Sequence, residues 1–349
     1  METKLIDLKT RYTEFKKENP KVRIRNAAEA LEVTEAELLA TSLGENVIKL
    51  NPDFKGILMR IEEIGEVKAI SRNDEVVHER NGTYLNGSFN PHVSLFVGED
   101  IDLRIFNTVW KFAFAVKDPF KNDFRRSIQF FAKDGTALHK IYLTTKSDLS
   151  AYEQIVQDFT NDDQYMDLDI EERVAKEKEL PDNEIDTAGF QDEWINLKDT
   201  HDFYGMVKKY KLTRTQALRH APEGNFAIKV DNSAMREVCN RAAEKAVPIM
   251  AFVGNQGIIQ IHTGPIKKLM DFEEWFNVLD PHFNLHVKEP GIKETWIVRK
   301  PTEDGVVTSL EVFNYQNELI LTLFGKRKPG IAELEEWRSI IQEVQDLNE

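Results

Sequence analysis

Hydrophobic and polar residues alternate along two long parts of the chain, from about residue 46 to 146 and from about 247 to 325. The alternating runs are short and rich in β-branched and aromatic residues, as in VVHERNGTYL, KFAFAVK and SIQFFAKDG. The KDG tripeptide between two such runs is typical of a hairpin turn. Residues with helical periodicity flank both parts. Meandering strands with helices segregated to the ends favour an α+β fold with antiparallel sheets.

The second half of the chain repeats the first at a spacing of 182 residues. Asn73 matches Asn255 in ISRNDEVVHERNG and FVGNQGIIQIHTG, and Pro119 matches Pro301. The run SIQFFAKDGTALHKIYL (127–143) aligns without a gap with SLEVFNYQNELILTLFG at the same spacing. Solenoids and propellers repeat every 20–50 residues, so each copy here is a whole domain. We therefore expect two homologous halves, each with a large antiparallel β-sheet flanked by helices, and residues present in only one copy become candidates for function.

The segment between the two sheets is acidic and poor in apolar residues, NDDQYMDLDIEERVAKEKELPDNEIDTAGFQDEW. This composition is typical of a solvated linker. The predicted organisation is an N-terminal repeat (1–160), an acidic linker (161–195) and a C-terminal repeat (196–349). Before the sheets, FKKENP aligns with VKKYKL at an offset near 192. This change of spacing indicates that the helices have diverged more than the strands.

Charge and cysteine usage exclude several classes of function. The formal net charge of −14 opposes binding to a phosphate backbone, so we disfavour the alternative that helix-turn-helix-like pairs such as TRTQALRH read DNA, and we expect no nucleic-acid partner. The one cysteine, Cys239, allows no internal disulfide and fits a reducing cytoplasm. Its amphipathic surroundings predict a buried, inert thiol. No apolar run approaches 18 residues, so we expect a cytoplasmic protein that is not inserted in a membrane.

One histidine at the start of the second copy has no counterpart in the first. His201 lies in LKDTHDFYGMVKKY at the start of the second half, and the offset near 192 leads back to Lys9. Asp199 or Thr200 would cap the helix and place His201 in its first turn. The positive end of the helix dipole favours neutral imidazole, the form that binds a transition metal. A structural histidine explains the same pattern, and no HExxH, CxxC or Gly-rich phosphate motif names an enzyme.

Several segments along nearly the whole chain resemble the HemS/ChuS-type hemin-degrading factors, a family of duplicated cytoplasmic bacterial proteins. They include NGTYLN, DLRIFNTVW, RRSIQFFAKDG, DTHDFYGMVKKYKLTRTQAL, FVGNQGIIQIHTG, WFNVLDPHFNLH and WIVRKPTEDGVVTSLEVF. The resemblance implies that the chain binds haem (iron protoporphyrin IX). Family members are described both as haem-degrading enzymes and as haem carriers, so the resemblance leaves these two functions open.

The resemblance also implies site residues. His201 matches the family's axial iron ligand, and Arg104 in DLRIF matches an arginine that approaches the other face of the haem. Basic residues of the family's LTR, TRKP and YGQR segments hold the propionates, and they match Arg214, Lys300 and Arg327. The expected cleft lies where the helix of His201 faces the strand of Arg104.

Further residues complete the predicted site. Haem is a flat apolar disc, so we expect aromatic walls, from Phe203 and Phe252. Phe324 stands where the family has tyrosine, which removes any hydrogen bond from a phenol, and Lys326 replaces a glutamine. His78 matches a histidine considered for a second haem site. A strand histidine in VVHER can equally be an outward-facing polar residue.

Two functions follow from the resemblance. In the first, the protein degrades haem in a haem oxygenase-like reaction that needs oxygen and an electron donor, and Arg104 is catalytic. In the second, it is a cytosolic carrier that delivers haem to a separate oxygenase. The inner-membrane haem importer is an expected partner in both. For Arg104 the alternative is a salt bridge with Asp102, and for the propionate-binding residues it is an ordinary surface cation.

Overall fold

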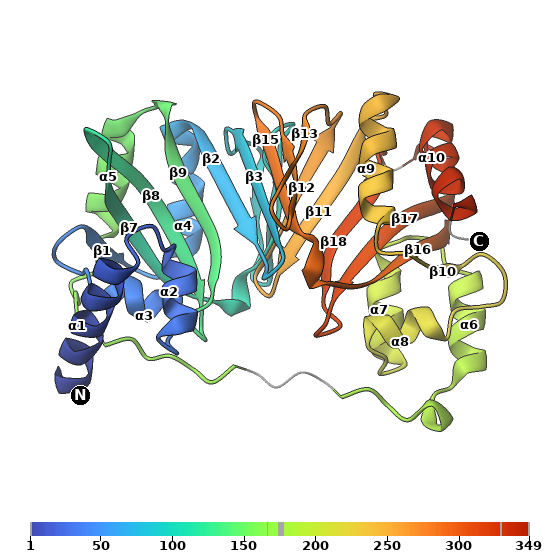
Figure 1. Cartoon of the computed structure of the whole chain (residues 1–349), viewed down its shortest axis with the longest axis horizontal. Helices are drawn as coiled ribbons and strands as arrows, with labels where there is room; N and C mark the ends of the chain where they lie inside the picture. Colours follow the sequence, from blue (N-terminus) through green and yellow to red (C-terminus); the bar gives the residue numbers. More distant parts are fainter. Residues whose placement is uncertain (1, 166, 174–177, 329, 348–349) are drawn as a thin grey trace. The chain divides into compact units, whose positions relative to one another are not determined.

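The computed structural model describes residues 2–165, 167–173, 178–328 and 330–347. It contains two compact units (Figure 1). Unit 1 comprises Met1–Ser71, Glu79–Val174 and Asn255–Gln260. Unit 2 comprises Arg72–His78, Ala175–Gly254 and Ile261–Glu349. Each unit therefore consists of one half of the chain together with a short hairpin segment from the other half.

Unit 1 is built on an antiparallel sheet whose central strands β7 and β8 carry runs of consecutive buried residues. Its strand order is β1 (Val47–Leu50), β7 (Trp110–Phe120), β8 (Asp123–Ala132), β9 (Ala137–Ser147) and β2 (Gly65–Arg72). A second antiparallel ribbon consists of β4 (Gly87–Phe89), β5 (Val93–Val97) and β6 (Asp102–Phe106), and β3 (Val76–Gly82) precedes it in the chain.

Helices pack on both faces of the unit 1 sheet. The apolar sides of α4 (Phe54–Arg60), η1 (Ile61–Ile64) and α5 (Leu149–Phe159) share a core with the sheet residues Ala113, Ile128 and Phe130. Another core joins α2 (Ile24–Ala30) and α3 (Glu35–Ala40) to Phe114 and Phe131. The N-terminal helix α1 (Glu2–Glu18) packs on α2 and α3 through Leu8. The short η2 (Asn107–Val109) connects β6 to β7.

Unit 2 repeats this plan. Its strand order is β10 (Ala227–Val230), β16 (Ile292–Thr302), β17 (Gly305–Asn314), β18 (Leu319–Gly325) and β11 (Ile249–Asn255). Its antiparallel ribbon consists of β13 (Leu269–Phe272), β14 (Trp275–Leu279) and β15 (Phe283–Lys288). The remaining strand and 3-10 segment are β12 (Ile258–Gly264) and η4 (Glu289–Gly291).

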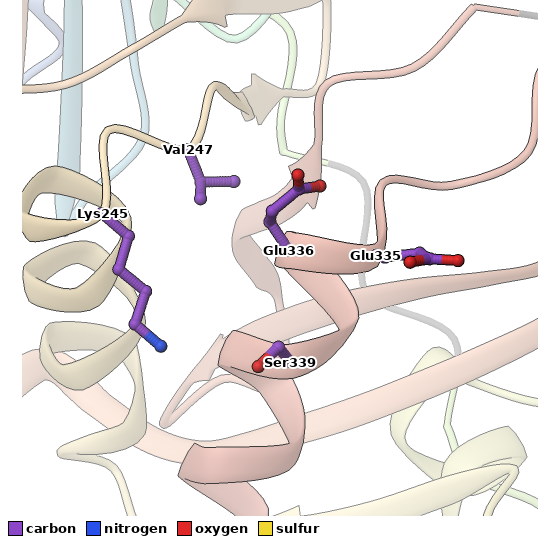
Figure 2. Close-up of a pocket in the computed structure, with 5 residues that line it drawn as sticks. All are labelled: Lys245, Val247, Glu335, Glu336 and Ser339. Atoms are coloured by element: carbon purple, nitrogen blue, oxygen red, sulfur yellow. The ribbon is translucent and has the colours of Figure 1, made fainter.

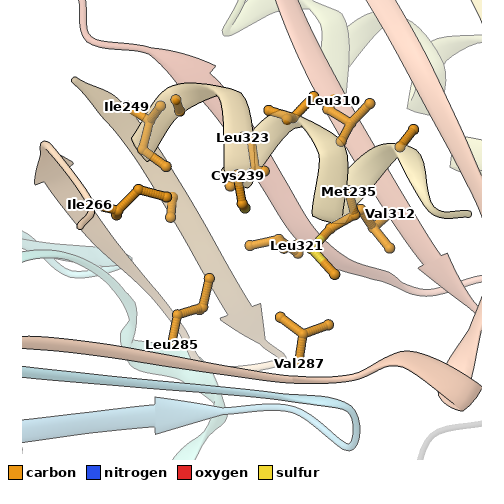
Figure 3. Close-up of a cluster of buried hydrophobic side chains, with 14 of the residues drawn as sticks. Met235, Cys239, Ile249, Ile266, Leu285, Val287, Leu310, Val312, Leu321 and Leu323 are labelled. Carbon is orange, nitrogen blue, oxygen red and sulfur yellow. The ribbon is translucent and has the colours of Figure 1, made fainter. Parts of the chain in front are cut away.

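The unit 2 sheet also has helices on both faces (Figure 1). On one face, α9 (Ala234–Glu244) and α10 (Glu335–Asp346) cover the core, where Met235 and Cys239 meet Leu310, Leu321 and Leu323 (Figure 3). On the other face, α6 (Thr187–Ile195), α7 (Asp202–Lys209) and α8 (Arg214–Arg219) pack on β16 and β17. The prediction of an α+β fold with two homologous halves is confirmed.

The predicted acidic linker is partly wrong. Residues 166 and 174–177 lie outside the described residues, but the end of the segment forms η3 (Asp182–Glu184) and α6. Phe190 and Trp194 of α6 are fully buried in contact with each other, and Trp194 Nε1 donates a hydrogen bond of 3.1 Å to the carbonyl of Arg299. Two large aromatic side chains four residues apart outweigh the acidic composition, because they bury enough apolar surface to dock the helix.

The predicted offset of the helices is also wrong. Both α3 and α8 begin with a capping box, formed by Thr34 with Glu37 and by Thr213 with Gln216. These equivalent caps lie 179 residues apart, so the helices have kept nearly the spacing of the strands. At this spacing His201 corresponds to Val22, and the first half still has no histidine at that place.

Among the described residues, none of the helices combines the length and apolar character that a membrane crossing requires.

Candidate functional site

The imidazole of His201 is exposed and held by a neighbouring carboxylate. His201 is the N-cap residue of α7, one position before the predicted first turn. Oδ1 of Asp199 accepts a hydrogen bond from the backbone N–H of His201 at 2.9 Å and lies 2.7 Å from its Nδ1. The His201 side chain is 87% exposed. Nε2 makes no hydrogen bond to the described residues, so it is the ring atom available to a ligand.

Asp199 keeps its negative charge beside this ring. The backbone N–H of His201 and then its imidazole donate to the carboxylate and lower the pKa of Asp199, and the charge of Arg327 acts in the same direction. Histidines that bind metals usually donate their second N–H to a carboxylate or carbonyl, which fixes the ring and raises its basicity. Asp199 and His201 have this relationship.

The start of α7 is anchored to the sheet through Phe203. This side chain lies two residues after His201 and is buried. The guanidinium carbon of Arg214 lies 4.3 Å from the centre of the Phe203 ring, and Nζ of Lys300 lies 4.9 Å from it. Cations in such positions are attracted by the ring quadrupole. Phe203 is only 1% exposed and orients the first turn that follows His201, and its role as a wall of the site stays a prediction.

A buried carboxylate, Glu311, joins the two cations. Arg214 donates to it from Nε at 2.9 Å and from Nη2 at 2.5 Å, and Lys300 donates from Nζ at 2.9 Å. The Glu311 side chain is 0% exposed and that of Lys300 is 5% exposed. Burial lowers the pKa of Lys300 to about 8. Burial also raises the pKa of Glu311, but the charges of Arg214 and Lys300 outweigh that effect and lower it to about 2.

This triad of Arg214, Lys300 and Glu311 carries one net positive charge. Lys300 is enclosed and committed to Glu311, whereas the Arg214 side chain is 23% exposed. Sequence reasoning missed Glu311. The signal was its place in SLEVF, where a charged residue stands between apolar residues of a strand that is buried on both faces.

The first half has no such triad. The spacing of the helices places Glu35 at the position of Arg214, and the spacing of the strands places Gln129 at the position of Glu311 and Asp118 at that of Lys300. Glu35 instead accepts a hydrogen bond of 2.7 Å from Lys140. The triad is therefore a feature of the second copy alone, as is His201.

Half-buried aromatic side chains continue the same sheet face. Glu311, Thr322 and Phe252 lie directly opposite one another on β17, β18 and β11, so their side chains share a face. Phe252 and Phe324 meet edge to face with their ring centres 5.1 Å apart. Both rings are half-buried. The structure thus brings the predicted residues Phe203, Arg214 and Lys300 together, and places Phe252 and Phe324 on the same sheet.

Arg327 follows β18 and is also half-buried. Its Nε atom is buried and finds no hydrogen-bond acceptor among the described residues. A buried guanidinium N–H without an acceptor costs free energy, so this atom is suited to an anionic ligand. Lys326, the residue before it, is exposed.

Arg104 belongs to unit 1. On β6 its Nη1 forms a salt bridge with Asp102 and donates a hydrogen bond of 3.2 Å to the carbonyl of Leu103. Burial raises the pKa of Asp102 against the opposing influence of Arg104. The salt bridge considered for Arg104 is therefore present, and its role toward haem stays a prediction.

His78 is fully buried in unit 2, so the alternative that it faces outward is wrong. Phe283 lies between two histidines: its ring meets His78 edge to face at 5.0 Å and stacks on His262 at 3.6 Å. Nδ1 of His286 in the same unit lies 2.6 Å from Oδ1 of Asn277. A second haem site at His78 stays a prediction.

A surface cavity of about 440 Å³ lies elsewhere in unit 2, between the end of α9 and the start of α10. It is lined by Lys245, Val247, Glu335, Glu336 and Ser339 (Figure 2). None of the predicted site residues lines it. Its two carboxylates would repel a dicarboxylate such as haem, so we do not assign the ligand to it.

Comparison with known proteins gives consistent matches. The family model for the haemin-degrading HemS/ChuX domain matches twice, at residues 32–159 and 211–344. The hemin transport protein HemS of Yersinia enterocolitica is 38% identical over 334 residues, which cover 95% of each chain. The crystal structure of holo-PhuS, a heme-binding protein from Pseudomonas aeruginosa, is 42% identical and superposes with a TM-score of 0.95 over 97% of this chain and 99% of that one. The structure of ChuS, described as an E. coli heme oxygenase, is 34% identical with a TM-score of 0.87 over 97% and 99%.

Proposed function

The chain belongs to the haemin-degrading HemS/ChuX family, and on that premise we propose that it binds haem through His201 and degrades it oxidatively, so that iron is released. The observation that carries the proposal is the pairing of an exposed imidazole with Asp199, which leaves Nε2 for a metal. The relatives support haem as the ligand, since they include a heme-binding protein and a hemin transport protein.

The chemistry of the donor set fits haem better than a free metal ion. Among the described residues, no group of three or more His, Cys, Asp or Glu side chains is placed to hold a metal ion. A single imidazole suits a metal that brings its other ligands with it, as iron does in a porphyrin. The two propionates require cations, and Arg214 and Arg327 are the partly exposed guanidinium groups of unit 2 that we assign to them.

When bound, haem would supply redox-active iron and the porphyrin carbon that is oxidised. Nε2 of His201 would donate its electron pair to the iron, while Asp199 holds the Nδ1–H and the orientation of the ring. Phe252 and Phe324 would pack on the apolar macrocycle and exclude water from it. Lys300 would act indirectly, because it holds Glu311 and Phe203 rather than a propionate.

We assign the catalytic contribution to Arg104. Its guanidinium would donate hydrogen bonds to negative charge that develops on the ligand, and such preorganised donors stabilise transition states. To do so, the guanidinium of Arg104 would have to replace part of its salt bridge with Asp102 by hydrogen bonds to the ligand. The reaction also consumes dioxygen and requires electrons from a separate donor.

The alternative is a non-catalytic carrier that stores haem or delivers it to another oxygenase. The relatives support both functions, since one is a hemin transport protein and another is described as a heme oxygenase. We place either activity in the cytoplasm, downstream of the inner-membrane haem importer. The single cysteine, which allows no internal disulfide, supports a reducing compartment.

One experiment separates the two functions. The stoichiometric ferric haem complex is exposed to air, a reductant and catalase, which removes free peroxide. Degradation predicts loss of the main haem absorbance band, an open tetrapyrrole in mass spectrometry and iron captured by a ferrous chelator. A carrier would keep the band unchanged and pass intact haem to apomyoglobin. Failure of one equivalent of haem to develop a protein-bound spectrum would refute both.

A further inference from the structure

The tip of the β7–β8 hairpin in unit 1 carries two exposed phenylalanines. Phe120 ends β7 and is 50% exposed, and Phe124 near the start of β8 is 43% exposed. All residues from 119 to 125 are exposed, so the turn projects from the unit as a narrow tip. Large apolar side chains in such a position contribute nothing to the core and expose hydrophobic surface to water.

Four cations surround these two rings. Nζ of Lys117 lies 4.4 Å from the centre of the Phe124 ring, and the guanidinium carbon of Arg126 lies 5.8 Å from it. Lys121 and Arg125 lie 5.4 and 5.8 Å from the centre of the Phe120 ring. We call these six residues the basic–aromatic tip.

The local charge of the tip is opposite in sign to the net charge of the protein. Two carboxylates stand between its residues in the sequence: Asp118 lies 4.0 Å from Arg125, and Asp123 lies 3.6 Å from Arg126. Four cations against two carboxylates leave a local excess of positive charge in a chain whose net charge is −14. Salt screens charges more than about 8–10 Å away at moderate ionic strength. A surface in contact with the tip therefore interacts with the positive charges of the tip rather than with the negative net charge of the chain.

The duplicated fold provides an internal comparison. The hairpin of β16 and β17 has the same register, since Phe120 pairs with Asp123 and Thr302 pairs with Gly305. In the second copy, Thr302 and Val306 stand at the positions of the two phenylalanines, and Glu303 stands at the position of Lys121. The hairpin therefore folds without aromatic rings or a cationic excess, and these features of the first copy need an explanation other than folding.

We propose that the basic–aromatic tip docks the protein reversibly on an anionic lipid surface. Lysine and arginine attract acidic headgroups, and aromatic rings insert into the boundary between headgroups and acyl chains. A folded protein partner is the less suitable occupant. Stable protein interfaces bury about 800 Å² per partner, and a turn of seven exposed residues presents no broad face of that size.

The test is cosedimentation of the full-length protein with vesicles of phosphatidylcholine, with and without phosphatidylglycerol. We expect retention on the vesicles that contain phosphatidylglycerol at about 0.1 M salt and release at about 1 M, where the Debye length falls from about 10 to about 3 Å. The double substitutions Arg125→Glu/Arg126→Glu and Phe120→Ser/Phe124→Ser should each reduce the bound fraction several-fold.

A matched control is available in unit 2. Phe272 is 64% exposed at the end of β13, but it is followed by Glu273 and Glu274 instead of cations. Phe272→Ser should leave vesicle binding unchanged, and thermal melts should show that all variants fold. The proposal is overturned if anionic vesicles retain no wild-type protein, or if both double variants bind as wild type. Loss of vesicle binding together with tip-dependent self-association in sedimentation velocity would assign the tip to a second copy of the chain.

Discussion

Nδ1 of His201 lies 2.7 Å from Oδ1 of Asp199, and the same oxygen accepts the backbone N–H of His201. These two contacts fix the orientation of the ring. The carboxylate selects the tautomer with the proton on Nδ1, which leaves the electron pair of Nε2 for iron.

Asp199→Ala should weaken haem binding without abolishing it. Loss of such a supporting carboxylate typically costs about 10- to 100-fold in metal affinity. The iron–histidine stretching frequency in resonance Raman spectra of the ferrous protein should also fall, because the imidazole becomes less basic. Asp182→Ala is the control: Asp182 lies 3.2 Å from Nε2 of His220 in the same unit, and its loss should change neither measurement.

Glu311→Gln should destabilise the folded protein at neutral pH by about 3 kcal/mol, because it leaves Arg214 and the buried Lys300 without their counter-charge. The measurement is the free energy of unfolding in urea. Gln129 occupies the equivalent position of the first half, so glutamine itself fits the strand. The added substitution Lys300→Met should recover part of the loss. Unchanged stability of Glu311→Gln would contradict the triad.

The contribution of Glu311 to the free energy of unfolding should also decrease as the pH falls. Its pKa falls from an ordinary 4.5 to about 2 in the folded protein, so the unfolded chain binds a proton in this range and the folded protein does not. The stabilisation is present above about pH 4.5 and is lost as the pH falls toward 2. The difference in unfolding free energy between wild type and Glu311→Gln should therefore shrink over this range. A difference that stays constant would contradict the assignment.

Arg104→Ala separates catalysis from binding. We expect the haem affinity to stay within about threefold of wild type, because the guanidinium makes no assigned bond to iron or propionate. The degradation rate should fall by about 100-fold, which is typical when a donor that stabilises developing charge is lost. Single-turnover decay of the haem band measures the rate. Asp102→Ala frees the same guanidinium from its salt bridge and should not lower the rate. A normal rate in Arg104→Ala would remove it from the mechanism.

Cys239 should be inert in the folded protein. It is fully buried on the side of α9 that packs on the core, and burial raises its pKa to about 12, so almost no thiolate exists at neutral pH. A thiol reagent should label less than about a tenth of the protein in the native state and all of it in denaturant. Rapid native labelling would show that α9 opens or that the thiol is exposed.

The sheets could be predicted because short runs of apolar, β-branched and aromatic residues leave a local pattern in the sequence. The exchange of hairpins between the units could not. Asn73 and Asn255 are visible as a repeated pair, but their partners are remote: Nδ2 of Asn73 donates to the carbonyls of Gly254 and Ile320, and Nδ2 of Asn255 donates to that of Leu138. These bonds depend on strands more than 100 residues away, which no local pattern encodes.

The site was predictable to a similar extent. His201 was visible because it has no counterpart in the first half, and the cations were visible through the family resemblance. Glu311 was not, because its role depends on Arg214 of α8 and Lys300 of β16, which meet it only in the folded sheet. The structure consequently changes the role that we expect for Lys300, from a propionate partner to the counter-charge of Glu311.

The most direct test of the account is a titration of His201→Ala and His220→Ala with ferric haem, followed by absorbance and electron paramagnetic resonance. His220 is a matched control, since it is also paired with an aspartate in unit 2. We predict that His201→Ala loses at least about tenfold in affinity and shows an altered iron spectrum that added imidazole restores, while His220→Ala behaves as wild type. A wild-type spectrum and affinity in His201→Ala would contradict the central claim that this imidazole binds the iron.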